Sequence, residues 1–196
     1  MSRARACSPA NPGDYRSPAV LVDVEGVLAD LRPFEHELSP GSETGARKRW
    51  TAFFAHIPEA GLIEAGAELV HALTAIGARA QYSTTRPYWA ARATRDWLAA
   101  RGLPAGYLYS RSPSNGKTGY VHSQFPTLGP AATIKAAHCA FVHDRDGLGA
   151  FIDDEPDAVT ALRHSGFPAV LLSDLSAATT RQLHSLTRHR RLAPTT

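Results

Sequence analysis

Acidic side chains end two short apolar segments that lie far apart in the sequence. Asp23 and Glu25 stand at the end of AVLVDV, and Asp153 and Asp154 end GAFIDD. Taken singly, each of these acids is more often a helix cap or a turn residue. If the fold brings the two segments together, however, their carboxylates repel each other unless a proton or a cation lies between them. A hard divalent cation, Mg²⁺ in particular, is the simplest explanation for such a pairing.

Strand-like segments and amphipathic helices alternate along the chain. Strands are predicted at 19–24, 78–84, 107–110, 149–154 and 168–172, and helices at 47–57, 64–76, 87–102, 131–139, 155–164 and 177–186. The strands are apolar runs, which favours a parallel α/β sheet with helices on both faces. Ligands of such sheets bind outside the carboxyl ends of the strands. The functional residues are therefore expected among the acids above and among Ser83, Thr84 and Arg86, which follow the second strand.

The composition indicates one globular domain. The chain has 196 residues, of which 43% are hydrophobic. No apolar run approaches the roughly 18 residues of a membrane-spanning helix, so we expect no membrane partner. Two cysteines and a first segment without an apolar signal core favour the cytoplasm.

The basic residues gather at the two ends of the chain. The net charge is +3 and the pI about 9.1, yet the body carries more acids than bases. A basic nucleic-acid-binding platform is therefore disfavoured, although the arginine-rich ends leave a nucleic-acid contact possible. We predict a disordered basic leader over 1–17, one domain over 18–187 with an insert at about 31–62, and a basic tail over 188–196.

Four motifs resemble those of the haloacid dehalogenase-like (HAD) hydrolase superfamily, over about residues 18–175. LVDVEGVLAD looks like the first motif, D-x-D-x-[T/V]-L, and YSTTRP is similar to the second. FIDDEPDAV resembles the fourth motif, and TIKAAHC supplies Lys135 where the third motif expects a lysine. The stretch WLAARGLPAGYLYSRS is also similar to the phosphatase half of polynucleotide kinase-like proteins and to actinobacterial HAD proteins.

The resemblance implies a Rossmann-like α/β fold with a small or absent cap, and a Mg²⁺-dependent hydrolase of phosphomonoesters. Asp23 would attack phosphorus and form an aspartyl-phosphate, and Glu25 would transfer protons. Mg²⁺ would be held by Asp23, by the backbone carbonyl of Glu25 and by Asp153 or Asp154. An open site would accept either a small phosphorylated molecule or a polynucleotide end.

The resemblance also assigns the residues that contact the substrate. Thr84 would donate its hydroxyl to a phosphoryl oxygen, and Lys135 would contribute a compact cation that also neutralises the carboxylates. Arg86 and Arg111 are further candidates for binding the phosphate or the rest of the substrate.

One position departs from the family pattern. The second acid of the first motif is normally Asp and is Glu25 here, so one extra methylene moves the proton donor by about 1.5 Å, a carbon–carbon bond length. The sequence therefore leaves a second hypothesis open, namely a catalytically impaired HAD-like domain that binds a phosphorylated partner or a nucleic-acid end.

Two further patterns have competing interpretations. Lys117, in SRSPSNGKT, competes with Lys135 for the phosphate contact, and Lys135 is favoured because it lies at a helix start near the fourth motif. No helix follows this GKT, which argues against a nucleotide-binding P-loop. His138, Cys139 and His143 fit no common zinc spacing, so we expect a packed cysteine and surface histidines.

Aromatic residues cluster in the predicted helix at 47–57. Trp50, Phe53 and Phe54 recur there at helical spacing, which is typical of a face packed on the core. They also fall between the first two motifs, where HAD proteins carry their variable cap. A substrate pocket is therefore an equal alternative.

Overall fold

The computed structural model describes residues 18–39, 45–112, 125–175 and 180–187, so the leader and the tail predicted at the ends lie outside it. Its centre is a five-stranded sheet in the order β5-β4-β1-β6-β7, and every pairing is parallel, as predicted. The strands are β1 (Ala19–Asp23), β4 (Arg79–Ser83), β5 (Leu108–Tyr109), β6 (Leu148–Asp153) and β7 (Ala169–Leu171). The two acid-bearing strands, β1 and β6, are therefore neighbours.

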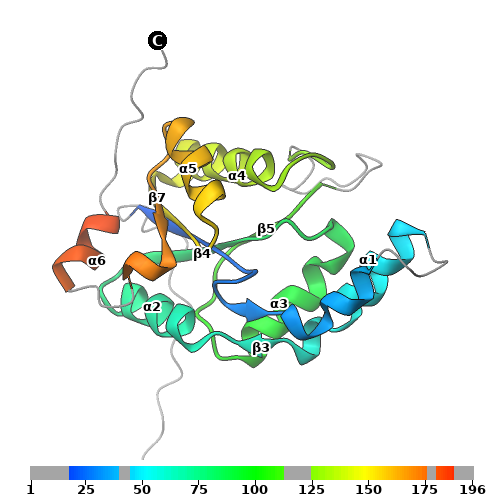
Figure 1. Cartoon of the computed structure of the whole chain (residues 1–196). Helices are drawn as coiled ribbons and strands as arrows, with labels where there is room; N and C mark the ends of the chain where they lie inside the picture. Colours follow the sequence, from blue (N-terminus) through cyan, green and yellow to red (C-terminus); the bar gives the residue numbers. More distant parts are fainter. Residues whose placement is uncertain (1–17, 40–44, 113–124, 176–179, 188–196) are drawn as a thin grey trace, which may run out of the picture.

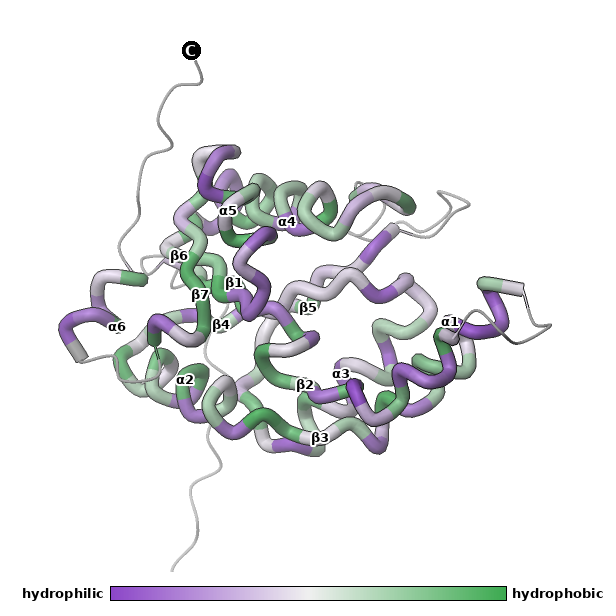
Figure 2. The backbone as a smooth tube through the Cα atoms, viewed as in Figure 1, coloured by the Kyte–Doolittle hydropathy of each residue, from purple (hydrophilic) through white to green (hydrophobic). Residues whose placement is uncertain are grey.

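Helices cover both faces of the sheet (Figure 1). One face carries α4 (Ala131–Asp146) and α5 (Pro156–His164), and the other carries α2 (Glu64–Ala75), α3 (Ala91–Ala100) and α6 (Thr180–Leu186). Successive side chains of β1 point to opposite faces, so Val20 and Val22 join the core beside α2, while Ala19 and Leu21 join the core beside α4. Figure 2 shows hydrophobic residues along β6 and β7 and hydrophilic segments on outer helices such as α6.

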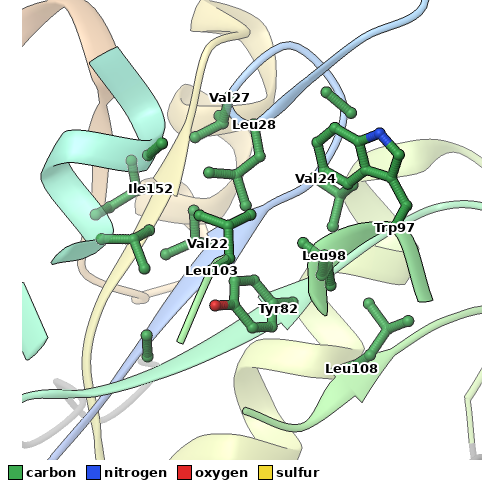
Figure 3. Packing of buried hydrophobic residues seen from close by; sticks show 14 of the residues in the cluster. Val22, Val24, Val27, Leu28, Tyr82, Trp97, Leu98, Leu103, Leu108 and Ile152 are labelled. Atoms are coloured by element: carbon green, nitrogen blue, oxygen red, sulfur yellow. The ribbon is translucent and has the colours of Figure 1, made fainter. Parts of the chain in front are cut away.

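The core beside α3 contains two large rings whose polar atoms are satisfied. Tyr82 and Trp97 pack with Val22 in this cluster (Figure 3). The Tyr82 hydroxyl donates to the carbonyl of Pro104 (2.6 Å), and the Trp97 indole N–H donates to the carbonyl of Ala60 (3.1 Å). Because a buried polar atom without a partner is costly, these bonds fix how α3 sits on the sheet.

Two helices differ from their predicted bounds. The helix α4, predicted to end at Cys139, continues to Asp146 because Val142 extends its buried face, and it stops at Gly147, which adopts a φ of 72°. The helix predicted from Pro87 begins as a 3-10 turn, η3 (Tyr88–Ala90), before α3. Among the described residues, no helix combines the length and the apolar character needed to cross a membrane.

A two-stranded ribbon flanks the stretch in which the sequence predicts an insert. Its strands, β2 (Ala29–Asp30) and β3 (Gly61–Leu62), pair antiparallel, with Ala29 opposite Leu62 and Asp30 opposite Gly61. Between them lie η1 (Arg32–Leu38), α1 (Ala46–Ala55) and η2 (Ile57–Glu59), and another 3-10 turn, η5 (Leu172–Leu175), follows β7. This ribbon was not predicted from the sequence, because strands of two residues carry no periodicity.

Candidate active site

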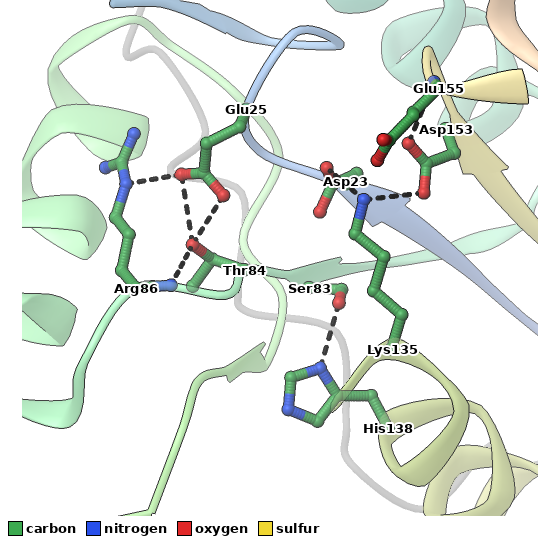
Figure 4. Close-up of polar contacts among 9 residues, drawn as sticks. All are labelled: Asp23, Glu25, Ser83, Thr84, Arg86, Lys135, His138, Asp153 and Glu155. Carbon is green, nitrogen blue, oxygen red and sulfur yellow. Dashed lines mark hydrogen bonds and ion pairs between the residues drawn. The ribbon is translucent and has the colours of Figure 1, made fainter. Parts of the chain in front are cut away.

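A buried lysine joins the acids at the ends of β1 and β6 (Figure 4). Asp23 is the last residue of β1 and Asp153 the last residue of β6, so the pairing of these two strands brings both carboxylates to one edge of the sheet. The Lys135 ammonium, from the first turns of α4, lies 3.0 Å from Asp23 Oδ2 and 2.7 Å from Asp153 Oδ2. All three residues are at most 4% exposed.

Burial and charge oppose each other at this centre. Burial raises the pKa of Asp23 well above its usual value, the Lys135 ammonium counteracts this rise, and Glu25 and Asp153 add to it. Burial alone lowers the pKa of Lys135, but the Asp23 and Asp153 carboxylates outweigh it and raise that pKa, so Lys135 stays an ammonium. Asp23 Oδ1 is buried and has no hydrogen-bond partner in the part of the chain that the structure describes. The site therefore favours a further cation at Asp23.

Asp154 completes a group of carboxylates with the donor set of a hard cation. Asp23, Asp153 and Asp154 each offer one oxygen, and these oxygens lie within 4.8 Å of one another. Oxygen donors of this kind suit Mg²⁺. Asp154 lies against Gly26, where a Cβ would stand only 2.1 Å from its Oδ2. Gly26 also has a φ of 70°, so both its space and its backbone conformation require glycine.

Glu25 points away from this carboxylate group. The Thr84 hydroxyl lies 3.0 Å from Glu25 Oε1 and 2.8 Å from Oε2, and the Arg86 guanidinium forms an ion pair with the same carboxylate. Thr84 and Arg86 are both almost fully buried, whereas the Glu25 side chain is 31% exposed. In this structure, therefore, the candidate proton-transfer residue binds the candidate phosphate-binding threonine.

Arg86 is held within the fold by hydrogen bonds from its backbone and from its guanidinium. Its backbone N–H donates to Thr84 Oγ1 (3.1 Å), and its Nη1 donates to Thr94 Oγ1 (2.9 Å). Its Nη2 is buried without a hydrogen-bond partner among the described residues. This Glu25–Arg86 pairing was not predicted, because sequence spacing does not show that a longer acid reaches a neighbouring strand.

Arg111 contacts backbone carbonyls. Its Nε donates to the carbonyl of Thr85 (2.6 Å), and its Nη1 donates to that of Gly129 (3.2 Å). These bonds tie the chain after β5 to the chain after β4. The predicted substrate contact of Arg111 stays a prediction, and the competing Lys117 falls outside the described residues.

His138 is buried below the carboxylates, so the prediction of a surface histidine is wrong for this residue. Its Nδ1 lies 2.9 Å from Ser83 Oγ, and its Nε2 lies 3.3 Å from the carbonyl of Ser110. It stands one helical turn after Lys135, and that spacing is the signal that could have placed it on the same inner face. Cys139 is buried, as predicted, and nearby His143 is half-buried.

An open cavity of about 780 Å³ adjoins these groups. Its lining includes Asp23, Lys135 and Asp154, and also Glu25 and Arg32. The cavity is large enough for a phosphate ester, and its lining includes both Asp23 and the Lys135 ammonium. The arrangement can hold a divalent cation and offer Asp23 to an electrophile.

Comparison with solved structures finds related folds at low sequence identity. The chain aligns with a chain of a Pnkp1/Rnl/Hen1 complex (TM-score 0.57, 14% identity) over 88% of its own length and 50% of that chain. It aligns with a chain of a Pnkp1/Rnl/Hen1 RNA repair complex (TM-score 0.50, 16% identity) over 86% and 46%. A HAD family hydrolase from Deinococcus radiodurans R1, with bound phosphate and sodium, aligns over 87% and 94% (TM-score 0.49, 18% identity).

These likenesses concern the fold. The chain spans about half the length of the two RNA repair chains that it resembles. No protein-family model matches the chain, and no curated protein matches its sequence significantly. Together with the five parallel strands and the helices on both faces, the structural likeness shows a Rossmann-like α/β fold shared with the aligned chain of the Pnkp1/Rnl/Hen1 complex.

Proposed function

We propose that the protein is a Mg²⁺-dependent phosphomonoester hydrolase that works through an aspartyl-phosphate on Asp23. The observation that carries this proposal is the position of Lys135, whose ammonium bridges Asp23 and Asp153 while Asp154 lies within reach of both acids. A lone structural ion pair needs no third carboxylate and no unpartnered oxygen on Asp23. A site that receives a cation and a phosphate accounts for both.

Asp23, Asp153 and Asp154 would hold the metal. Three carboxylates of this kind fit Mg²⁺, and the partnerless Oδ1 of Asp23 provides a ligand atom. When bound, Mg²⁺ supplies positive charge that stabilises the transferring phosphoryl group. The backbone carbonyl of Glu25, expected from the sequence as a further ligand, stays part of the proposal.

The residues of the chain then share the two chemical steps. In the first step one Asp23 oxygen bonds to phosphorus, the phosphorus–oxygen ester bond breaks, and the leaving oxygen takes a proton from Glu25. In the second step Glu25 takes a proton from water, the water oxygen bonds to phosphorus, the bond between phosphorus and the Asp23 oxygen breaks, and inorganic phosphate leaves. Lys135 offsets part of the cost of burying the Asp23 carboxylate and contacts phosphoryl oxygens, and Thr84 donates to them once Glu25 has moved.

A second candidate function rests on the contacts of Glu25. Because Thr84 and Arg86 already bind its carboxylate, Glu25 is engaged away from the Asp23 centre. A HAD-like domain whose acid stays in this position would bind a phosphorylated partner or a nucleic-acid end without turning it over. The RNA repair assembly that contains a similar fold is consistent with a polynucleotide end as ligand or substrate.

The scarcity of cysteine leads us to propose the cytoplasm as the location.

Hydrolysis of p-nitrophenyl phosphate and of a panel of alkyl phosphates, with Mg²⁺ and with chelator, tests the proposal on the full chain. Turnover is expected only with Mg²⁺, and Asp23→Asn is expected to abolish it while circular dichroism and thermal unfolding stay those of a folded protein. Asp96→Asn, at an exposed acid on α3, is the matched control and should retain activity.

The two candidate functions give different results. Full activity of Asp23→Asn would contradict the aspartyl-phosphate mechanism. An inactive parent protein that still binds inorganic phosphate in the presence of Mg²⁺ would favour the binding domain.

A further inference from the structure

A second cavity, of about 500 Å³, opens beside the catalytic one. The two cavities share Glu25, Glu35, Phe53 and Thr85 in their linings, so they adjoin each other. A molecule whose phosphate lies at Asp23 has this second cavity within reach of its leaving group. This inference rests on the proposed phosphatase function.

Aromatic side chains of α1 form one wall of this second cavity. The Trp50 ring stacks on Phe54, with 5.4 Å between centroids and 23° between planes, and meets Phe53 edge-on at 5.8 Å. Phe53 and Phe54 are buried, but Trp50 remains 47% exposed. A large apolar ring held in position by two buried neighbours and still half exposed presents a preformed surface for another planar ring.

The remaining lining supplies hydrogen-bond partners of both kinds. Glu35, exposed on η1, and Glu25 offer carboxylate oxygens that accept N–H groups and repel further phosphates. Arg86 lines the same cavity, and its buried Nη2 has no partner among the described residues. The cavity therefore suits a flat, uncharged ring that carries both N–H donors and acceptor atoms.

We propose that this cavity binds the nucleobase of the substrate, so that the phosphomonoester is a nucleoside phosphate whose base stacks on Trp50. A hydrocarbon ring would leave Arg86 Nη2 without a partner, whereas a base offers acceptor atoms to Arg86 and an exocyclic amino group to Glu35. The same chemistry occurs in a free mononucleotide and in the terminal nucleotide of a polynucleotide.

Equilibrium binding to the full-length Asp23→Asn protein, in which we expect no turnover, tests the proposal. Titration calorimetry with Mg²⁺ compares adenosine 5′-monophosphate with ribose 5-phosphate, which lacks the base. We expect the nucleotide to bind at least tenfold more tightly. Adding Trp50→Ala should weaken nucleotide binding by about five- to a hundredfold and leave ribose 5-phosphate unchanged, and Trp50→Phe should restore most of the loss.

Trp89→Ala is the matched control. Trp89 is 55% exposed and also packs on Phe54, but it does not line the cavity. Its removal should leave both affinities unchanged. Equal affinities for the two ligands, an equal loss for both with Trp50→Ala, or the same loss with Trp89→Ala would overturn the proposal.

Two further measurements separate a failure of the phosphatase function from a failure of the base site, and a free mononucleotide from the end of a polynucleotide. A parent protein that hydrolyses neither compound, while the base-dependent binding persists, would contradict the phosphatase function and leave the base site standing. Hydrolysis of both compounds with no dependence on the base would support the phosphatase function and contradict the base site. A dinucleotide with a terminal phosphate, compared with the mononucleotide, shows which source binds more tightly.

Discussion

The Thr84 hydroxyl lies 2.8 Å from Glu25 Oε2, so a buried threonine on one strand end holds the carboxylate that follows its neighbouring strand. The extra methylene of glutamate, compared with aspartate, extends this carboxylate to Thr84 and Arg86. The length of Glu25 therefore has a visible structural role, and proton transfer by Glu25 requires these contacts to break.

Shortening this acid should free it from that position. We expect Glu25→Asp to raise turnover of alkyl phosphates, because the proton donor then stays closer to β1, and general acid–base catalysis typically contributes about 10²–10⁴-fold. Activated aryl phosphates, whose leaving groups need little protonation, should change much less. Steady-state rates on both substrate classes measure the difference. A variant slower on every substrate would show that the longer acid is fitted to its own site.

Lys135 should matter for both stability and turnover. Lys135→Met keeps much of the side-chain volume but leaves Asp23 and Asp153 as uncompensated buried carboxylates, so a loss of about 3–5 kcal/mol in the free energy of unfolding is expected. Urea unfolding at neutral pH measures it, and kcat should fall by about 10²–10³-fold. Lys117→Met is the control for the competing lysine. A larger kinetic effect at Lys117 would move the phosphate contact to that segment.

Mg²⁺ should stabilise the folded protein by ligand linkage. Binding to the folded state alone contributes about 2.7 kcal/mol when the free metal is at a hundred times its Kd. The thermal midpoint should therefore rise with MgCl₂, beyond what NaCl of equal ionic strength produces. The double variant Asp153→Asn, Asp154→Asn should lose this dependence. A thermal unfolding midpoint of the parent protein that does not change with Mg²⁺ would count against a metal site.

Gly26 should be intolerant of a side chain for two separable reasons. Gly26→Ala forces a Cβ into the Asp154 carboxylate and also places alanine at a φ of 70°. Gly77→Ala is the matched control, because Gly77 has a φ of 84° and nothing within 4 Å of its would-be Cβ. Both variants should lose about 1–2 kcal/mol of stability from backbone strain. Only Gly26→Ala should also weaken Mg²⁺ binding, as titration calorimetry would show.

Asp146, at the end of α4, forms polar contacts with Arg79 and Gln81 of β4, and its contribution to the stability of the fold should depend on pH. Burial opposes its ionisation, but hydrogen bonds from Arg145 and Gln81 outweigh burial and lower the pKa of Asp146. Its stabilising effect is therefore complete above the unfolded pKa of about 3.9 and disappears as the pH falls through the lower folded value. Asp146→Asn should cost about 1.5–3 kcal/mol at pH 7 and much less near pH 3, by urea unfolding. A loss that did not change with pH would contradict this assignment.

The sequence predicted the scaffold better than the contacts within the site. The apolar runs of β1 and β6 are bounded by glycine, proline or polar residues, and their alternation with helices predicts a parallel sheet. The motif resemblance suggested that Asp23, Lys135 and Asp153 converge. The ion pair between Arg86 and Glu25 could not be predicted, because it depends on the lengths and rotamers of side chains that follow two different strands, and not on the spacing of residues along one strand.

The pairing of Ala29 with Leu62 and of Asp30 with Gly61 closes the segment between them at its base. Because its two ends meet at adjacent backbone positions, a replacement of different length can use the same pair of attachment points, provided that it also supplies an acceptor for the Trp97 indole in place of the Ala60 carbonyl. Asp23 and Asp153 end strands of the separate central sheet. Chimaeras made at this ribbon would therefore alter which leaving groups fit and retain the machinery for cleaving them.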